Sequence, residues 1–204
     1  MRSGKPRLDP VWKAFDEATF GAKNSLNLRD SLPSAADATF RTESWLRERQ
    51  VSGAKEVLII TGRGNQSPDG ISVVRKAVLS LLPALHRRGI VGDWREHSPG
   101  SLVVRLQPLS ALLNAPRRKR DRETEHHVPL GPQALAGLNQ QTLRLLRSLA
   151  LRSLDSLGVR DPEKFVEAEM LEKFNSLAGS IPAGEGSEER LQHAIATALD
   201  QLDE

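Results

Sequence analysis

The sequence predicts a mixed α/β domain followed by an all-α segment. Between residues 24 and 107, short alternating or β-branched runs are separated by stretches with apolar residues at helical spacing. From residue 133 onward, leucines recur at helical spacing and no strand-like run interrupts them. The 204 residues suffice for about one or two domains, with a core that requires no disulfide or metal.

The first half of the α/β region predicts a strand, a helix and a second strand. Residues 25–29 alternate between apolar and polar side chains, which indicates a short strand with one buried face. Ser34 and Asp37 have the spacing of an N-cap and the third helical position, so a helix follows. Gly53 ends this helix. Residues 57–60 form a continuous apolar run, typical of a strand buried on both faces.

The second half predicts a helix and a β-hairpin. Residues 67–69, Ser-Pro-Asp, have the composition of a helix start, with proline at the first helical position. An apolar stripe runs over residues 71–82, and Pro83 is expected to kink or end the helix. Two strands follow at residues 90–96 and 101–107, joined by a turn that contains Pro and Gly.

The remaining segments flank this unit. We expect residues 1–23 to be an N-terminal helical extension, residues 24–107 the α/β domain, residues 108–132 a basic linker, and residues 133–204 a helical C-terminal region. Within the linker, residues 110–115 are apolar enough to dock on the domain. The C-terminal region is expected to form a small three-helix bundle, with a long helix from Leu135 to about Leu157, a second from Asp161-Pro162 and a third from Ser187.

The composition excludes several function classes. The chain has no cysteine, which rules out a thiol nucleophile, a cysteine-ligated metal site and a disulfide framework. The longest apolar run, residues 57–60, is far shorter than the ~20 residues of a membrane span. The first ten residues lack the apolar core of a secretory signal. We therefore expect a cytoplasmic protein without a membrane partner.

The net charge of +3 conceals a strong asymmetry. Residues 1–152 contain 25 Lys and Arg against 14 Asp and Glu, a balance of +11, whereas residues 153–204 contain 4 against 12, a balance of −8. A basic body favours a polyanionic partner such as DNA or RNA. The acidic end is expected to be a solvated surface or to fold back on the basic domain.

Three motifs occur in an order that identifies a family. A strand reads Leu26-Asn27-Leu28-Arg29-Asp30, the buried strand ends in Thr61-Gly62-Arg63-Gly64, and a helix contains Val73-Val74-Arg75-Lys76-Ala77-Val78. This order resembles the small MutS-related (Smr) domain of bacterial type, over residues 24–107. The resemblance implies a two-layer α/β sandwich with a four-stranded mixed sheet, similar to the C-terminal domain of bacterial translation initiation factor three. It also implies nucleic-acid binding, and in many members endonuclease activity on DNA or RNA.

The first motif departs from the family pattern. Family members have aspartate and histidine where this chain has Asn27 and Arg29, while Thr61 is a residue that the family allows. Aspartate can accept a proton and histidine can exchange one near neutral pH, but asparagine cannot act as a base and arginine stays charged. The acid–base pair of the family is therefore missing at its usual place.

Two interpretations of the site follow. In the first, the domain binds nucleic acid with little or no cleavage, and Arg29 contacts a phosphate. In the second, the domain is a structure-selective endonuclease in which Arg29 and Arg63 stabilise the phosphate at the transition state. Asp30, Asp69 or His97 would then serve as base or as ligand to a divalent metal. Each of these three also has an ordinary role, as a turn former, a helix N-terminal charge and an exposed turn residue.

The nucleic-acid contacts are expected around the glycine loop. Glycines at positions 62 and 64 allow a phosphate to approach the backbone, and Arg63 between them can reach a second phosphate. The loop is not a nucleoside-triphosphate loop, because no Gly-Lys-Ser/Thr follows. The expected binding residues are Arg29, Thr61, Gly62, Arg63, Gly64, Arg75 and Lys76.

The sequence leaves three functions open. The replaced acid–base pair favours a nucleic-acid-binding protein over an active endonuclease, which would be a hydrolase. Aromatic residues make up only 4% of the chain, so recognition of backbone and structure is favoured over base-specific readout. The separate acidic tail supports a third function, an adaptor that binds a protein partner. No cofactor is required by the first or the third function.

Overall fold

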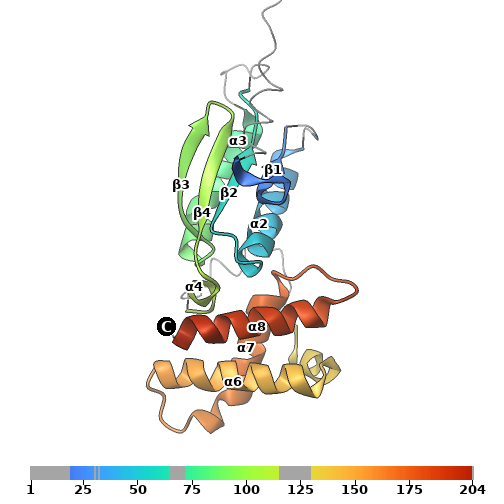
Figure 1. Ribbon diagram of the computed structural model, residues 1–204, viewed down its shortest axis with the longest axis vertical. Coiled ribbons are helices and arrows are strands. Elements are labelled where there is room, and N and C mark those ends of the chain that lie inside the picture. Colours follow the sequence, from blue (N-terminus) through green and yellow to red (C-terminus); the bar gives the residue numbers. More distant parts are fainter. Residues whose placement is uncertain (1–18, 30, 32, 65–71, 115–129, 204) are drawn as a thin grey trace, which may run out of the picture.

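The structure is a computed structural model that describes residues 19–29, 31, 33–64, 72–114 and 130–203. An α/β part and a bundle of helices are stacked along the long axis of the molecule, with the short helix α4 (Leu109–Asn114) between them (Figure 1). The predicted N-terminal helix lies mostly outside the described residues, which contain only its last turn at Thr19 and Phe20.

The α/β part contains a four-stranded mixed sheet, as predicted. Its strands are β1 (Ser25–Asn27), β2 (Glu56–Ile60), β3 (Val91–Ser98) and β4 (Ser101–Leu106), arranged in the order β1-β2-β4-β3. β1 is parallel to β2, because the helix between them returns the chain to the same end of the sheet. β4 is antiparallel to both of its neighbours, and it forms the predicted hairpin with β3.

Two helices cover one face of the sheet. α2 (Ala35–Val51) and α3 (Val73–Arg87) pack against each other and against alternate residues of the central strands. Val57, Leu58 and Ile59 of β2 are all fully buried, which confirms that this strand has no solvated face. This helical layer and the sheet form the predicted two-layer sandwich, whose core includes Leu28, Leu46, Val57, Ile59, Val78, Leu82, Leu102 and Val104.

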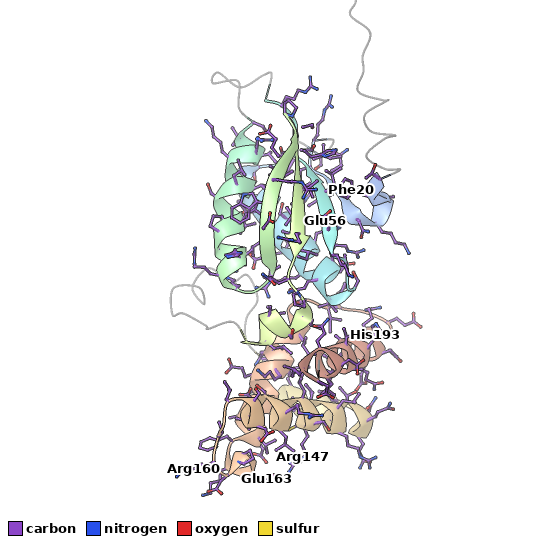
Figure 2. All side chains as sticks on the ribbon, turned by 60° about the vertical axis from the view of Figure 1, so that its left-hand side comes forward. Phe20, Glu56, Arg147, Arg160, Glu163 and His193 are labelled. Carbon is purple, nitrogen blue, oxygen red and sulfur yellow. The ribbon has the colours of Figure 1, made fainter. Side chains whose placement is uncertain are left out.

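The opposite face of the sheet is polar at its surface. Two cross-strand ion pairs lie on it, Arg95–Glu56 at 3.3 Å and Arg105–Asp93 at 2.7 Å. The 3₁₀ helix η1 (Ala22–Asn24) contacts β1 and β2, and Figure 2 shows Phe20 and Glu56 on this side of the α/β part. Arg105 and Asp93 lie on the adjacent strands β4 and β3, whereas Arg95 of β3 reaches across β4 to Glu56 of β2, and each pair brings opposite charges together. A polyanion would therefore bind more strongly at another surface.

The predicted capping of α2 is confirmed. The Ser34 hydroxyl accepts the backbone N–H of Asp37 at 3.1 Å, and the helix begins at the next residue after Ser34. At the other end, α2 stops at Val51, and Gly53 has a φ of 76°. A glycine reaches this left-handed conformation without the steric cost of a β-carbon, so it terminates the helix.

The predictions for α3 concern its start and Pro83, which was expected to kink or end the helix. The expected start at residues 67–69 lies outside the described residues, and the described helix begins at Val73 with Ser72 as its N-cap. Pro83 lies inside the helix, which continues to Arg87. An internal proline costs about 3 kcal/mol. Burial of the apolar stripe, at about 1.5–3 kcal/mol per side chain, outweighs it; the stripe is Val78, Leu82 and Leu85.

The C-terminal region forms the predicted three-helix bundle, made of α6 (Gln140–Ser156), α7 (Val166–Ala178) and α8 (Ser187–Asp203). The predicted long helix ends where expected, but it begins later, at Gln140. The chain forms a 3₁₀ helix, η2 (Pro132–Gly137), and α6 starts anew because the Asn139 side chain accepts the N–H of Thr142 at 2.8 Å. None of the helices in the described ranges has the length and apolarity to cross a membrane.

Helix α4 joins the two parts, in the apolar stretch predicted to dock. Leu109, Leu112 and Leu113 are buried, and α4 contacts both α7 and α8. The Lys173 ammonium of α7 donates to the Leu113 carbonyl at 2.9 Å, and the Ser110 N–H donates to Gln201 of α8 at 2.9 Å. Because α4 follows the C-terminal end of β4, the bundle is attached at the end of the sheet opposite the β3–β4 turn (Figure 1).

One buried side chain fixes the start of α4 to the α/β part. The Gln50 amide donates to the carbonyls of Gly89, Gln107 and Pro108, at 2.7, 3.1 and 3.2 Å. These carbonyls belong to the loop after α3 and to the segment that leads from β4 into α4. A single amide group therefore connects the end of α2 with the loop after α3 and with the start of α4. The segment expected to be a linker thus begins with an ordered, helical section.

Candidate nucleic-acid interface

The glycine loop Thr61–Gly64 is held to the β3–β4 turn by one carbonyl group. The oxygen of Gly100 accepts the backbone N–H groups of Thr61 and Gly62 at 2.9 and 3.0 Å. The Thr61 hydroxyl also donates to this oxygen at 3.3 Å, and Thr61 is almost fully buried. These two N–H groups are engaged within the protein. The groups that remain to face a ligand lie in the second half of the loop.

The backbone conformation of this loop requires glycines. Gly62 and Gly64 have φ values of 78° and 82°, in the left-handed region that other residues rarely occupy. The turn is also tightly packed, because a β-carbon on Gly100 would lie 3.1 Å from the Gly62 carbonyl carbon and 3.2 Å from Arg63. The absence of a side chain at position 100 therefore sets how closely the two loops approach each other.

The first turn of α3 is joined to the same loop. Ser72, the N-cap of α3, donates its hydroxyl proton to the Thr61 carbonyl at 3.2 Å. Arg75 lies one turn further, with its guanidinium 3.1 Å from Glu96 and 3.5 Å from the Pro99 carbonyl. Lys76 is the next residue of the helix and is exposed. The positive end of the helix dipole thus lies beside the glycine loop.

The first motif reaches the loop from β1. Asn27 pairs with Ile60 across the parallel strands, so the two strands end side by side. The Asn27 side-chain oxygen accepts the backbone N–H of Arg29 at 3.0 Å and shapes the turn after β1. The Arg29 side chain then runs along Gly62, with its Cγ 3.6 Å from the position of a β-carbon there.

Three predicted residues are therefore brought together at one end of the sheet, and we call them the arginine cluster: Arg29, Arg63 and Arg75. They come from the turn after β1, the loop after β2 and the first turn of α3. Arg63 is exposed and makes no hydrogen bond or ion pair with another residue of the described ranges. Arg41 of α2 was not predicted; its guanidinium donates to the Ser31 hydroxyl at 3.0 Å, close to the turn that carries Arg29.

The predicted acid–base candidates are not brought together in the described part of the chain. Asp30 and Asp69 lie outside the described residues. His97 is exposed on β3, with its ring edge-to-face against Phe20 at a centroid distance of 5.8 Å. Among the described residues, no group of three or more His, Asp or Glu side chains could hold a metal ion.

Comparison with known proteins identifies the α/β part. Residues 26–107 match the family model of the Smr domain. This segment is an Smr domain. The family is associated with nucleic-acid binding and nuclease activity. No curated protein and no solved structure matches the chain.

In the described residues, the Smr domain places guanidinium groups around the glycine loop. Guanidinium groups donate several charge-assisted hydrogen bonds to phosphate oxygens in a fixed planar geometry. Asn27 is neutral, and its oxygen is already bound to the backbone of Arg29. Glu96, the carboxylate described beside the arginine cluster, is paired with Arg75. Among the described residues, the site therefore combines three arginines with a carboxylate that is already paired.

Proposed function

We propose that the chain binds nucleic acid through the phosphate backbone, at the arginine cluster and the adjoining glycine loop, and that it does so without cleaving it. The contacts would be made by Arg29, Arg63, Gly64, Arg75 and Lys76, while Thr61 and Gly62, also expected from the sequence, would hold the loop in place through the Gly100 carbonyl. The observation that carries the proposal is the convergence of three arginines, from three separate segments, on one end of the Smr domain. DNA and RNA share the phosphate chemistry that would be recognised.

The geometry supports backbone contacts rather than base readout. An exposed arginine between two glycines can reach a phosphate without moving other elements. No tyrosine exists in the chain, and aromatic residues are scarce, so few rings are available to stack on bases. Contacts to phosphates position a protein on nucleic acid but carry no sequence information. Selectivity would then depend on the shape of the nucleic acid, such as a branch or a single strand.

Binding is tested by fluorescence anisotropy with labelled single-stranded, duplex and branched DNA and RNA over a salt series. Affinity should fall steeply with salt, because phosphate contacts release counterions. Arg63→Gln should weaken binding to every substrate and reduce the slope of log K against log salt by about 1. Arg144→Gln provides the matched control, since Arg144 is also exposed but lies on α6. A flat salt dependence, or equal losses in both variants, would contradict the proposal.

Cleavage is tested separately with labelled structured RNA and branched DNA, in the presence of common divalent metals. The wild-type chain should yield no product. The double variant Asn27→Asp/Arg29→His restores the residue types of the family, and the introduced carboxylate can still accept the backbone N–H two residues further along the turn. If the double variant yields product and the wild type does not, the replacement of Asp and His in the first motif accounts for the loss of cleavage. Product from the wild type would establish the alternative, a structure-selective endonuclease.

A further inference from the structure

The ion pair between Arg75 and Glu96 joins a shielded cation to an exposed anion. The two side chains meet at 3.1 Å, and only 12% of the Arg75 side chain is exposed, against 58% of the Glu96 side chain. The two ion pairs on the opposite face of the sheet differ, because each joins two exposed side chains. Arg75 is therefore held against the protein, whereas Glu96 approaches it from the solvent side.

Arg75 and Arg63 flank the same short turn. The Arg75 guanidinium lies 3.5 Å from the Pro99 carbonyl. The next residue, Gly100, packs on Arg63, whose backbone nitrogen and Cγ would each lie 3.2 Å from a β-carbon on Gly100. Consecutive Cα atoms are only about 3.8 Å apart. A phosphate bound by the exposed Arg63 is therefore brought close to Arg75.

Glu96 and such a phosphate are alternative partners for Arg75. Carboxylate and phosphate oxygens accept the same charge-assisted hydrogen bonds from a guanidinium group. Arg75 has a single positive charge and little exposed surface, so it cannot neutralise two anions at once. Both anions would also repel each other at this distance. A phosphate that reaches Arg75 must therefore displace the carboxylate.

The position of Glu96 allows it to leave. It lies on β3, an edge strand of the sheet (Figure 1), and the register of β3 against β4 becomes irregular directly after it, between Glu96 and Ser98. Within the described ranges, Glu96 makes no hydrogen bond or ion pair besides the one with Arg75. An ion pair with one exposed partner contributes little to stability. Its rupture therefore disturbs no other contact of Glu96.

We propose that Glu96 competes with phosphate for the guanidinium of Arg75 and thereby limits the affinity of the arginine cluster for nucleic acid. In the free protein Glu96 neutralises Arg75, and Arg29 and Arg63 are the exposed members of the cluster. When a backbone phosphate binds beside Arg63, Glu96 turns to solvent and Arg75 pairs with the phosphate. The inference rests on the proposed nucleic-acid binding, because it assigns a regulating residue to the same site.

The test is the binding of labelled single-stranded RNA and DNA, measured by fluorescence anisotropy at low salt. Glu96→Gln keeps the size of the side chain but removes its charge, and it should tighten binding about threefold. The double variant Arg75→Gln/Glu96→Gln should lose this gain, because the released guanidinium is absent. Asp93→Asn is the matched control. It removes the same charge from β3, but Asp93 pairs with Arg105 on the opposite face of the sheet, so the gain should be smaller.

Three results would contradict the competition. They are binding by Glu96→Gln that is no tighter than that of the wild type, a gain that persists in the double variant, and an equal gain in Asp93→Asn, which would reflect net charge alone. If Glu96→Gln weakens binding, the ion pair holds the β3–β4 turn in place and does not compete. A melting curve of each variant confirms that it is folded.

Failure of this inference is distinguishable from failure of the proposed function. If the wild type binds with a steep salt dependence and Glu96→Gln binds no more tightly, only the role of Glu96 is wrong. If neither protein binds, both proposals are wrong. Binding that is detected only in Glu96→Gln would support both, with Glu96 as a strong competitor.

Discussion

The backbone of Gly62 lies so close to Gly100 that a β-carbon on Gly100 would be 3.1 Å from the Gly62 carbonyl carbon. The contact is between backbone atoms, which cannot move aside as the end of a flexible side chain could. It joins the loop after β2 to the β3–β4 turn. The position of Arg63, and with it the shape of the arginine cluster, therefore depends on a residue that has no side chain.

Gly100→Ala tests this dependence. The added methyl group should push the two loops apart, at a cost of about 1–3 kcal/mol in the free energy of unfolding. It should also reduce nucleic-acid affinity, measured by anisotropy, although no charge is removed. Gly137→Ala is the control, because a β-carbon at Gly137 meets nothing within 4 Å. Unchanged affinity in Gly100→Ala would show that the loops can separate without harm to the site.

Gly89→Ala tests the packing of α4 on the α/β part. Gly89 has a φ of 74°, and a β-carbon there would lie 2.3 Å from the Ala111 carbonyl oxygen. Gly53 has nearly the same φ, 76°, with no atom within 4 Å. Gly53→Ala should cost about 1–2 kcal/mol from backbone conformation alone. Gly89→Ala should cost about 1–3 kcal/mol more because of the clash.

Denaturant unfolding of the two glycine variants measures the difference. If both lose the same stability, the contact between Gly89 and α4 is loose and the bundle is attached by other residues. If Gly89→Ala loses more, the excess reports the close approach of α4. The comparison cancels the cost that is common to any left-handed glycine.

Glu43→Gln tests a buried charge cluster between α2 and the end of α3. Glu43 accepts hydrogen bonds from Arg47 at 3.1 Å and from Arg88 at 2.8 Å, and all three side chains are at least nine-tenths buried. Loss of the carboxylate removes the negative charge that two buried guanidinium groups share, which should cost about 3–5 kcal/mol. The control is Glu48→Gln on the same helix. Glu48 pairs with Arg49 but is 39% exposed, so this substitution should lower the free energy of unfolding by less than about 1 kcal/mol. Chemical denaturation gives both values, and similar losses would contradict the importance of burial.

Glu188 should make the stability of the bundle depend on pH. Hydrogen bonds from the Asn139 backbone N–H and the Thr142 hydroxyl, both at 2.8 Å, lower the pKa of Glu188 from its ordinary value of 4.5. The folded state then holds its carboxylate proton less tightly than the unfolded state does. The stabilisation is complete above pH 4.5 and is lost as the pH falls through the lowered pKa.

The measurement is the melting temperature of the wild type and of Glu188→Gln between neutral and acidic pH. The wild type should lose more stability than the variant as the pH falls below 4.5. Thr142→Val removes one of the two donors and should give an intermediate slope. Identical slopes in the wild type and Glu188→Gln would contradict a role for this carboxylate.

Local signals in the sequence predicted most of the fold. The N-cap at Ser34, the apolar run of β2 and the hairpin of β3 and β4 each involve neighbouring residues, and each is confirmed. The errors occurred where two local signals compete. Pro83 was expected to kink or end the helix, and it does not end it, because the apolar stripe around it extends α3 to Arg87. Asn139 divides a continuous leucine pattern because its side chain caps α6.

The candidate site was predictable only in part. The motifs contain Arg29, Arg63 and Arg75, and the structure brings these residues to one end of the sheet. The role of Gly100 could not be predicted, because it depends on a contact with a loop 38 residues earlier in the sequence. For the same reason, the sequence could not show that the N–H groups of Thr61 and Gly62, in the loop expected to contact a phosphate, bind the Gly100 carbonyl.

Contacts of helix α4 also bind the Smr domain to the bundle without help from the covalent connection between them. The covalent path from α4 to the bundle runs through residues 115–129, but the chain is already bound to the bundle on both sides of that segment. Leu113 accepts a hydrogen bond from Lys173, and the Leu130 backbone exchanges hydrogen bonds with the Asn175 side chain at 2.7 and 3.1 Å. A protease cut between them would therefore leave two complementary fragments in one particle. Residues 1–114 and 130–204, produced as separate polypeptides, should reassemble.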